Sequence, residues 1–429
     1  MSSINQRSNK TVLTTHEGGV AKNITHIQEL RRTVLSCLLW EDDFYESGQD
    51  ISTRIEMLVT KVKPEIVHQL AIEARNDYKL RHVPLLLLSL CPNVNAIYNT
   101  IQRADELAEL LAIYWRNGKK PIPAQMKKGI AKAFTKFNEY DLAKYNRDSA
   151  IKLRDVLFMT HAKPKDDEQA ALWKRLVDNQ LTTPDTWEVA LSGGANKKET
   201  FERLLQEGKL GYLALLRNLR NMVESNVEST LVKNAILARK GADKVLPFRY
   251  IAAARKAIKY EPELDIALQQ SVELLPTFKG HTVLLIDVSG SMDSQLSSKS
   301  DMTRLDAASA LGVIVKSEDT SVFTFSNRVV QVPSRKGMAG IDAIKNSQSH
   351  DGTYLTSAIN TINNDIKYDR IIVITDEQSH DGCIAPLYGS KGYMINVGTS
   401  KNGVGYGSWT HIDGFSENVI RFITECENN

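Results

Sequence analysis

A short apolar segment that ends in one carboxylate and two hydroxyl groups constrains the fold of this chain more than any other feature. His281 to Ile286 are followed by Asp287, Ser289 and Ser291 at alternate positions. The apolar residues predict a buried parallel strand. The polar residues then fall in the loop at the carboxyl end of that strand, where open α/β sheets bind their ligands. A carboxylate beside small hydroxyls supplies oxygen ligands suited to a hard divalent cation, above all Mg²⁺.

The pattern around this segment predicts an α/β domain over residues 276–429. Extended apolar segments alternate there with helical ones, as is typical of a doubly wound, Rossmann-like parallel sheet covered by helices on both faces. The predicted strands are Val283–Ile286, Val322–Phe325, Ile371–Ile374 and Tyr393–Val397, and the predicted helices are Arg304–Lys316, Ile341–Ile344, Leu355–Ile362 and Glu417–Cys426.

Two further loops of this domain carry candidate ligands. Thr353 lies just before a predicted helix, and Asp376 closely follows the predicted strand Ile371–Ile374. The carboxyl ends of parallel strands meet at one edge of a sheet, so these side chains are expected to converge with those of the first loop. The alternative is that all of them are ordinary turn and helix-capping residues. The predicted metal ligands are Asp287, Ser289, Ser291, Thr353 and Asp376.

The three pieces in this order resemble the metal-ion-dependent adhesion site of a von Willebrand factor A domain. The resemblance implies a divalent cation, most often Mg²⁺, with an open coordination position for water or for an acidic group of a partner. One departure from the family pattern is Asp351, which stands where the family often has glycine. His350 and His380 are interpreted as loop histidines rather than ligands. No nucleophile or general base with a recognisable spacing accompanies the site, so we predict a protein that is not an enzyme.

The residues before the α/β domain predict a different architecture. Residues 1–23 are polar and without periodicity, which indicates a mobile tail. Residues 24–275 show apolar positions three and four apart, and proline or glycine interrupts them every 20 to 40 residues. Helix pairs of this size bury their apolar faces only against neighbours. We therefore predict an irregular α-solenoid of HEAT-type helical repeats.

The charge is unevenly distributed over the chain. Residues 116–175 hold 15 basic and 7 acidic residues, in a protein whose net charge is only +3. Lys128, Lys132 and Lys136 are four residues apart, so a single helix would place them on one face, with Lys127 beside them. A line of cations suits a phosphate backbone, and the alternative is a solvated helical face.

The helical region resembles the TROVE module of Ro ribonucleoproteins, and a von Willebrand factor A domain after it is the Ro architecture. The segments that carry the resemblance include Leu111–Trp115, Met126–Lys128, Leu153–Leu157, His161–Pro164, Thr186–Glu188, Arg217–Leu219 and Leu246–Tyr250. It implies a ring of HEAT-like repeats closed by the metal-site domain. It also implies small noncoding Y-like RNA on an outer basic surface and single-stranded 3′ ends of misfolded RNA in a central hole.

In this resemblance Lys136 and His161 match positions at which the family contacts Y RNA. A family arginine is replaced here by Tyr140, and Lys144 and Arg147 are the nearby cations that would take its place. The predicted RNA-binding residues are Lys127, Lys128, Lys132, Lys136, Lys144, Arg147 and His161. Phe137, Tyr140 and Tyr145 are interpreted as core residues rather than stacking platforms. Arg31, Arg32, Arg217 and Arg249 are further candidates for the hole, or else for ion pairs inside the solenoid.

The predicted function is therefore RNA binding in RNA stability or quality control. The alternative is a Mg²⁺-dependent protein–protein adaptor, in which the metal site captures a nuclease or another acidic partner. No apolar segment is long enough to span a membrane, and no signal peptide opens the chain. Four cysteines without Cys-x-x-Cys spacing indicate reduced thiols. We expect a cytoplasmic protein with no membrane partner.

Overall fold

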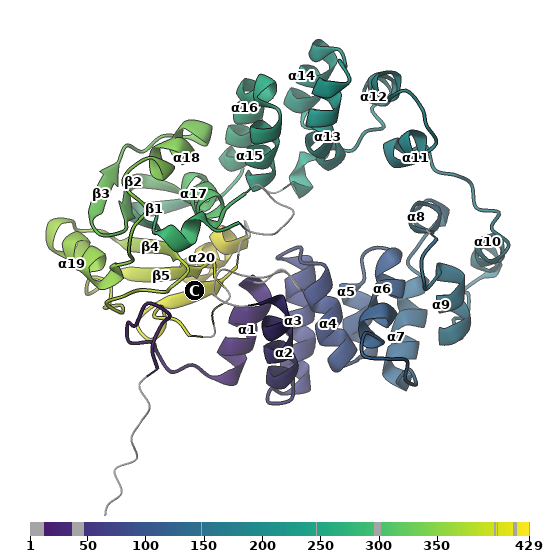
Figure 1. The fold of residues 1–429 in the computed structure, drawn as a ribbon, viewed down its shortest axis with the longest axis horizontal. Coiled ribbons are helices and arrows are strands. Elements are labelled where there is room, and N and C mark those ends of the chain that lie inside the picture. The colour runs from purple at the N-terminus through teal and green to yellow at the C-terminus, as the bar shows by residue number, and fades with distance from the viewer. Residues whose placement is uncertain are drawn as a thin grey trace, which may run out of the picture.

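The computed structural model describes residues 13–36, 47–146, 148–245, 247–295, 302–398, 400, 402–414 and 418–428. Helices fill the chain from His26 to Glu273, and a sheet flanked by helices follows from Thr277. Figure 1 shows the helices laid out as an arc that leaves the sheet domain at one side and returns to it at another. The predicted fold class, a ring-like helical array followed by a Rossmann-like α/β domain, is confirmed.

The helices of the arc are short, and their ends are set by local capping. Asn93, Asn138 and Asp166 accept backbone N–H groups at the starts of their helices, and Pro64 opens another at the position where proline fits. The helices are α1 His26–Ser36, α2 Gly48–Val59, α3 Pro64–Asn76, α4 His82–Leu90, α5 Val94–Thr100, α6 Asp105–Tyr114, α7 Ala124–Phe134, α8 Glu139–Tyr145, α9 Leu153–Thr160, α10 Asp167–Val177, α11 Trp187–Ser192, α12 Lys197–Gln206, α13 Tyr212–Glu224, α14 Ser229–Ala238, α15 Pro247–Lys256 and α16 Glu261–Glu273, with 3₁₀ turns η1 Ala242–Lys244 and η2 Ile258–Tyr260.

Two hydrophobic cores hold the arc together. The first extends from Leu30 in α1 to Leu176 in α10. The second begins at Phe201 in α12 and continues beyond α16 into residues of the sheet domain, including Ile341. The stretch between α10 and α11 joins the two halves without helix (Figure 1). The second half of the arc is thus packed as one body with the sheet domain. Among the described residues no helix is both long and apolar enough to cross a bilayer.

The sheet has the strand order β3-β2-β1-β4-β5-β6, and only the edge strand β3 is antiparallel. Helices pack on both of its faces, because β1 and β4 are apolar on both sides and must be covered twice. The elements are β1 Thr277–Asp287, η3 Gly290–Asp293, α17 Arg304–Ile314, β2 Lys316–Phe325, β3 Val329–Val332, α18 Gly337–Lys345, α19 Leu355–Asp365, β4 Arg370–Thr375, β5 Lys391–Asn396, β6 Thr410–Asp413 and α20 Asn418–Asn428.

The predicted elements of this domain are present, with two differences. The short edge strands β3 and β6 were not predicted, because four residues at a sheet edge leave no clear periodicity. Lys316 was predicted to end a helix, but it begins β2. Its ammonium donates to the carbonyls of Glu273 and Leu275 at the end of α16.

The prediction of a mobile tail is wrong for the part of it that the structure describes. Residues 13–22 form a turn, closed by a β-bridge between Thr14 and Val20, that packs against the sheet domain. The side chain of Thr15 is buried there. Polar composition suggested a tail, but these residues are held by hydrogen bonds rather than by an apolar core.

A buried ion pair joins the first helix to the sheet domain. The guanidinium of Arg32 in α1 donates to Glu377 Oε2 at 2.6 Å, and both side chains are fully buried. Arg32 also donates to the carbonyls of Ser400 and Asn402. On its other side Glu377 contacts His411 of β6, with 2.5 Å between Oε1 and Nε2. A buried pair persists only where further hydrogen bonds replace the lost water, and this cluster supplies them.

A second set of ion pairs joins the last helices to the sheet domain. Arg255 of α15 and Lys345 of α18 both bind the buried carboxylate of Asp306 in α17. Asp265 of α16 accepts the backbone N–H of Met338 at the start of α18, at 2.8 Å. Both ends of the helical arc are therefore fastened to the sheet domain by charged groups.

Replacing Arg32 by alanine should destabilise the fold by about 3–5 kcal/mol, because Glu377 would be left buried beside a gap. Urea unfolding of the full chain measures the loss. The matched control is Arg31→Ala, whose partner Glu73 lies within the solenoid and whose ion pair is partly exposed, so that about 0–1 kcal/mol is expected. Equal losses in the two variants would contradict a special role for the Arg32 contact.

The same cluster makes stability depend on pH above neutrality. Burial alone would lower the pKa of His411, but the charges of Glu377 and Asp413 raise it to about 9. Because the folded pKa lies above the ordinary value near 6.5, this stabilisation is complete below pH 6.5 and is lost as the pH rises through 9. We expect His411→Gln to remove roughly 3 kcal/mol of that pH dependence. Urea midpoints between pH 6 and pH 10 test this, with the exposed His26→Gln as the control that should keep it.

Candidate functional site

The candidate metal ligands lie where the winding of the sheet reverses. Strand β1 ends at Asp287, and Asp376 follows directly after its neighbour β4. The chain leaves these two strands toward opposite flanks of the sheet, so their loops separate and leave a crevice at the carboxyl edge. The geometry therefore places both carboxylates at the position where folds of this order bind ligands.

Short hydrogen bonds fix the first loop around Asp287. Its Oδ1 accepts the backbone N–H of Ser289 at 2.8 Å, and its Oδ2 accepts the hydroxyl of Thr375 at 2.5 Å. The hydroxyls of Ser289 and Ser291 are 3.3 Å apart, so the two oxygens face the same point. This orientation is what a shared cation would require.

The loop that carries Thr353 is joined to the other two. Gly290 of the first loop donates its N–H to the carbonyl of Asp351 at 3.0 Å. His380, in the loop after β4, donates its N–H to the carbonyl of Thr353 at 2.8 Å. The structure thus brings together the three loops that the sequence predicted to converge.

The histidines near the site have other partners. The ring of His350 contacts Asp293 and the carbonyl of Lys345. The ring of His380 contacts the backbone of Thr353 and the carboxylate of Glu17. Among the described residues no three His, Cys, Asp or Glu side chains gather as a metal site of those ligands would require. The candidate site combines two carboxylates with three hydroxyls instead.

The electrostatics of the site suit a cation. Burial and the neighbouring charge of Asp376 raise the pKa of Asp287 above its usual range. Two neighbouring buried carboxylates are relieved by a positive charge between them. Arg304 of α17 supplies part of it, with Nη1 3.3 Å from Asp376 Oδ2. The donor set of hard oxygens therefore fits Mg²⁺, beside a protein cation that already touches one carboxylate.

The predicted line of lysines is not a single helical stripe. Helix α7 ends at Phe134, so Lys136 lies beyond it. Its ammonium donates to the carbonyls of Tyr98 and Ile101 at the end of α5, at 2.8 and 2.5 Å. Burial there lowers the pKa of Lys136. The helix prediction was wrong at this point because four-residue spacing does not reveal where a helix stops.

Lys132 stays on the surface of α7 and shares an aromatic neighbour with Lys136. The ammonium groups of both lie 4.8 Å from the ring centroid of Tyr98. Lys132 also donates to the side chain of Asn95. Lys128 is exposed on the same helix, and Lys127 is partly exposed. Tyr98 was not singled out in the sequence, since only the packing of α5 on α7 brings it to these lysines.

A second aromatic group continues this surface through the loop after α5. Arg103 lies over the ring of Tyr145 at 4.6 Å, and Lys144 lies 5.8 Å from the rings of both Tyr140 and Tyr145. Tyr140 is half exposed, so its interpretation as a core residue is wrong, whereas Phe137 is buried as predicted. We call Tyr98, Arg103, Lys128, Lys132, Tyr140, Lys144 and Tyr145 the basic surface.

Two predicted RNA contacts stand apart from this description. Arg147 lies outside the described residues. His161 is exposed at the end of α9 in a left-handed conformation, with φ of 53°.

On the other half of the arc, Arg217 of α13 and Arg249 of α15 are exposed neighbours. Desolvation and the charge of Arg217 lower the pKa of Arg249. Two like charges placed beside each other in this way form a second place suited to an anion.

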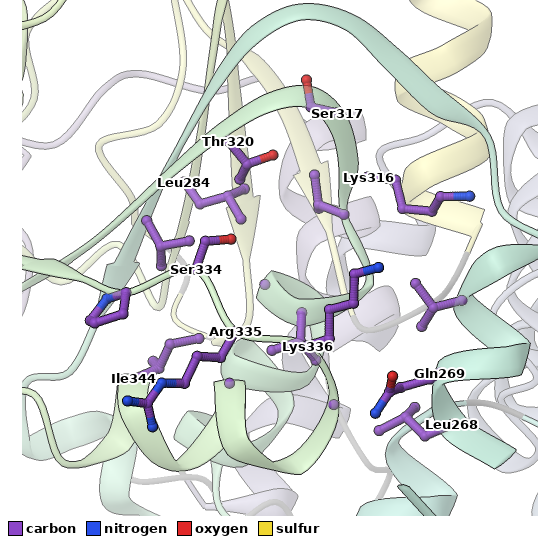
Figure 2. Close-up of a pocket in the computed structure, with 18 of the residues that line it drawn as sticks. Leu268, Gln269, Leu284, Lys316, Ser317, Thr320, Ser334, Arg335, Lys336 and Ile344 are labelled. Carbon is purple, nitrogen blue, oxygen red and sulfur yellow. The ribbon is translucent and has the colours of Figure 1, made fainter. Parts of the chain in front are cut away.

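A cavity of about 260 Å³ lies apart from both places, at the joint between α16 and the sheet domain (Figure 2). Its walls include Leu268, Leu284 and Ile344, and Lys316 and Lys336 lie at its edge. The ammonium of Lys316 is bound to carbonyls of α16, and Asp265 already occupies the start of α18. We interpret the cavity as a packing gap at the joint rather than as the functional site.

The chain is similar to known proteins in two respects. A model of the TROVE domain matches residues 173–259, which include Arg217 and Arg249 but not the basic surface. Telomerase protein component 1 of Mus musculus is 33% identical over 90 residues, and that of Rattus norvegicus is 31% identical over 90 residues. These matches cover 20% of this chain, and the chain spans only 3% of the length of either relative.

The second similarity is in fold and extends over nearly the whole chain. The crystal structure of the Deinococcus radiodurans Ro (RSR) protein superposes with a TM-score of 0.59, over 92% of this chain and 97% of that one. The two sequences are 17% identical, so the likeness concerns the arrangement of helices and sheet. The TROVE segment lies within this shared fold.

Proposed function

We propose that this chain is a member of the Ro ribonucleoprotein family, as its TROVE segment and its fold support, and that it binds RNA through cations on its helical arc. The observation that carries the proposal is the basic surface, where Lys132, Lys144 and Arg103 lie over tyrosine rings. Cations of this kind bind phosphates and release counterions, and the exposed ring of Tyr140 offers a face for an unpaired base.

The finer part of the proposal assigns different RNA segments to the two halves of the arc. The basic surface would bind the folded part of a small noncoding Y-like RNA. The pair Arg217 and Arg249, which lies inside the TROVE segment, would bind the phosphates of a single-stranded 3′ end, as on a misfolded RNA. A protein with these two contacts would serve RNA stability or quality control.

Changing Lys128, Lys132 and Lys144 to glutamate should weaken binding of a hairpin RNA with a single-stranded 3′ extension. Three lost phosphate contacts should make the slope of log K against log salt concentration shallower by about 2 to 3 units. Filter binding between 50 and 200 mM KCl measures both effects. Lys136 is left unchanged, because its ammonium binds two carbonyls and its replacement would disturb the fold.

The matched control changes three exposed lysines elsewhere to glutamate, namely Lys197, Lys279 and Lys367. It has the same net charge as the test variant and should keep most of the affinity. Equal weakening in both variants would show that net charge alone attracts the RNA and would contradict a localised surface. Arg217→Glu should reduce binding of the RNA with the 3′ extension more than binding of a blunt hairpin.

We also propose that Asp287, Ser289, Ser291, Thr353 and Asp376 hold a divalent cation, Mg²⁺ by donor type, without catalysis. Bound there, the ion would neutralise the two carboxylates and offer an open coordination position to a ligand oxygen. Arg304 would share the site with the ion, since it touches Asp376. The observation that supports this proposal is the convergence of two buried carboxylates, Asp287 and Asp376, with the facing hydroxyls of Ser289 and Ser291.

Mg²⁺ should stabilise the wild-type chain against heat, since a ligand that binds only the folded state adds about 2.7 kcal/mol at a hundred times its dissociation constant. Asp287→Asn should abolish this stabilisation. Asp293→Asn, which changes an exposed carboxylate on the neighbouring turn, should retain it. The melting temperature with and without 5 mM MgCl₂, roughly a hundredfold excess for a 50 μM site, decides the matter. A Mg²⁺ response that persists in Asp287→Asn would place the ion elsewhere.

A second candidate function is that of a Mg²⁺-dependent adaptor for an acidic protein partner, such as a nuclease. The observation that favours it is the pair of facing hydroxyls of Ser289 and Ser291, a donor set that would leave a coordination position open to an acidic ligand. RNA binding on the arc and partner binding on the sheet domain use separate surfaces. Partner retention that needs Mg²⁺ and survives ribonuclease treatment would distinguish the adaptor function.

A further inference from the structure

Residues 13–22 form a turn that packs against the sheet domain as a bound peptide would, and we call this segment the arm. It is closed on itself by hydrogen bonds from Thr15 to Gly19 and from Ala21 to Leu13, both of 2.8 Å. Glu17 and Gly18 form its tip. Figure 1 shows this dark purple segment beside the sheet domain, before the chain enters α1.

The arm binds the loop after β4, which also carries Asp376. The hydroxyl of Thr15 donates to the carbonyl of Ser379 at 2.9 Å, and the N–H of His16 donates to Gln378 Oε1 at 3.0 Å. Gly19 packs so closely that a Cβ atom there would lie 2.1 Å from the Ser379 oxygen. Asn402 also binds the arm, because its side-chain amide donates to the carbonyl of Thr14.

The acidic tip of the arm lies next to the candidate metal site. Glu17 Oε2 is 3.0 Å from His380 Nε2. The His380 ring stacks on Tyr354, and the backbone N–H of His380 donates to Thr353. Only one side chain therefore separates the Glu17 carboxylate from the residue that supplies a hydroxyl to the site.

The candidate ligands are covered while the arm is in place. Their exposed fractions range from 0% for Asp287 and Asp376 to 8% for Ser291. An acidic group of another protein could reach an ion at this site only after some covering chain has moved. The arm is suited to move, because polar contacts hold it and its Val20 side chain is 61% exposed.

We propose that the face formed by Gln378–Gly382, Asn402 and Gly403 is a docking surface for a turn-forming segment of a partner protein with an acidic residue at its tip, and that the arm is its built-in competitor. The arm shows what the surface accepts: a hydroxyl residue, an acidic residue two positions later and a glycine close to the Ser379 carbonyl. The partner's acidic residue takes the place of Glu17 beside the metal site. Only the Mg²⁺ dependence of partner binding rests on the proposed adaptor function. The docking surface itself does not.

Tethering makes the arm a strong competitor. A short flexible connection holds a segment at an effective concentration on the order of millimolar, so a free peptide at micromolar concentration is excluded from the intact chain. A partner succeeds by binding more tightly than the arm or by contacting the protein at a second place.

The test uses the full chain with Gly19→Leu, whose side chain cannot fit against Ser379 and should release the arm. The probe is a fluorescein-labelled peptide with the sequence of residues 13–22, followed by fluorescence anisotropy. If the arm is docked for more than nine-tenths of the time, its release should strengthen peptide binding by at least about tenfold. The same peptide with Glu17→Gln should bind the released chain more weakly.

Val20→Leu is the matched control, because this exposed residue touches nothing that excludes a larger side chain, and it should block the peptide as the wild-type does. Hydrogen exchange should show loss of protection at residues 15–21 in Gly19→Leu alone. Unchanged RNA affinity verifies that the variant is folded. A released arm with no gain in peptide binding overturns the proposal, and so does an arm that stays protected, since the close contact with Ser379 would then be unimportant. Dimers formed by exchange of arms would also overturn it, in favour of a second copy as the occupant.

Mg²⁺ separates this inference from the proposed metal site. Peptide binding that is equal with Mg²⁺ and with EDTA supports the docking surface and counts against the ion. Loss of the Mg²⁺-dependent melting shift in Asp287→Asn, together with no peptide binding to Gly19→Leu, supports the ion and overturns the docking surface.

Discussion

The fold depends on the contact between Arg32 and Glu377, because this buried ion pair turns an open row of helices into a closed ring. Neither side chain has any exposed surface, and taking two charges out of water costs several kcal/mol for each. Carbonyls of Ser400 and Asn402 and the ring of His411 complete the hydrogen bonding and offset that cost. The interaction is therefore specific, because α1 must dock in this orientation to place the Arg32 guanidinium against Glu377, beside the ring of His411.

Ring closure and the candidate metal site share the same loops. Glu377 follows Asp376 directly, and its backbone is left-handed, with φ of 60°. A residue other than glycine holds this strained conformation because the surrounding contacts enforce it. At the other end of the ring Asp306, which binds Arg255, lies two residues from Arg304 in α17, and Arg304 touches Asp376. The residues that fasten the two ends of the arc, Glu377 and Asp306, thus lie close in sequence to Asp376 and to its partner Arg304. The candidate metal site therefore adjoins both ring joints.

The sequence predicted the features that depend on local pattern and on the common edge of a parallel sheet. Asp287, Ser289 and Ser291 follow one strand, and Asp376 follows another, so their convergence required only the right strand order. The features it missed depend on contacts between distant segments. Tyr98 joins the basic surface through packing of α5 on α7, and Arg103 joins it where the loop after α5 meets Tyr145 of α8. Lys136 leaves the helical stripe where α7 ends. The arm was taken for a tail because hydrogen bonds to a distant loop leave no trace in composition.

The separation of charge along the ring has a physical consequence for any RNA that binds it. The basic surface belongs to the half of the arc whose core is independent of the sheet domain, whereas Arg217 and Arg249 belong to the half that is packed with it. The two halves are joined by a stretch without helix after α10, so their mutual position is fixed chiefly by the ion pairs at the ring joints. An RNA that contacts both halves therefore gains from a closed ring, because closure has already restricted the freedom that binding would otherwise have to remove. The ion pair between Arg32 and Glu377 would therefore raise the affinity for an RNA that contacts both the basic surface and the pair Arg217 and Arg249, although the ion pair itself is buried.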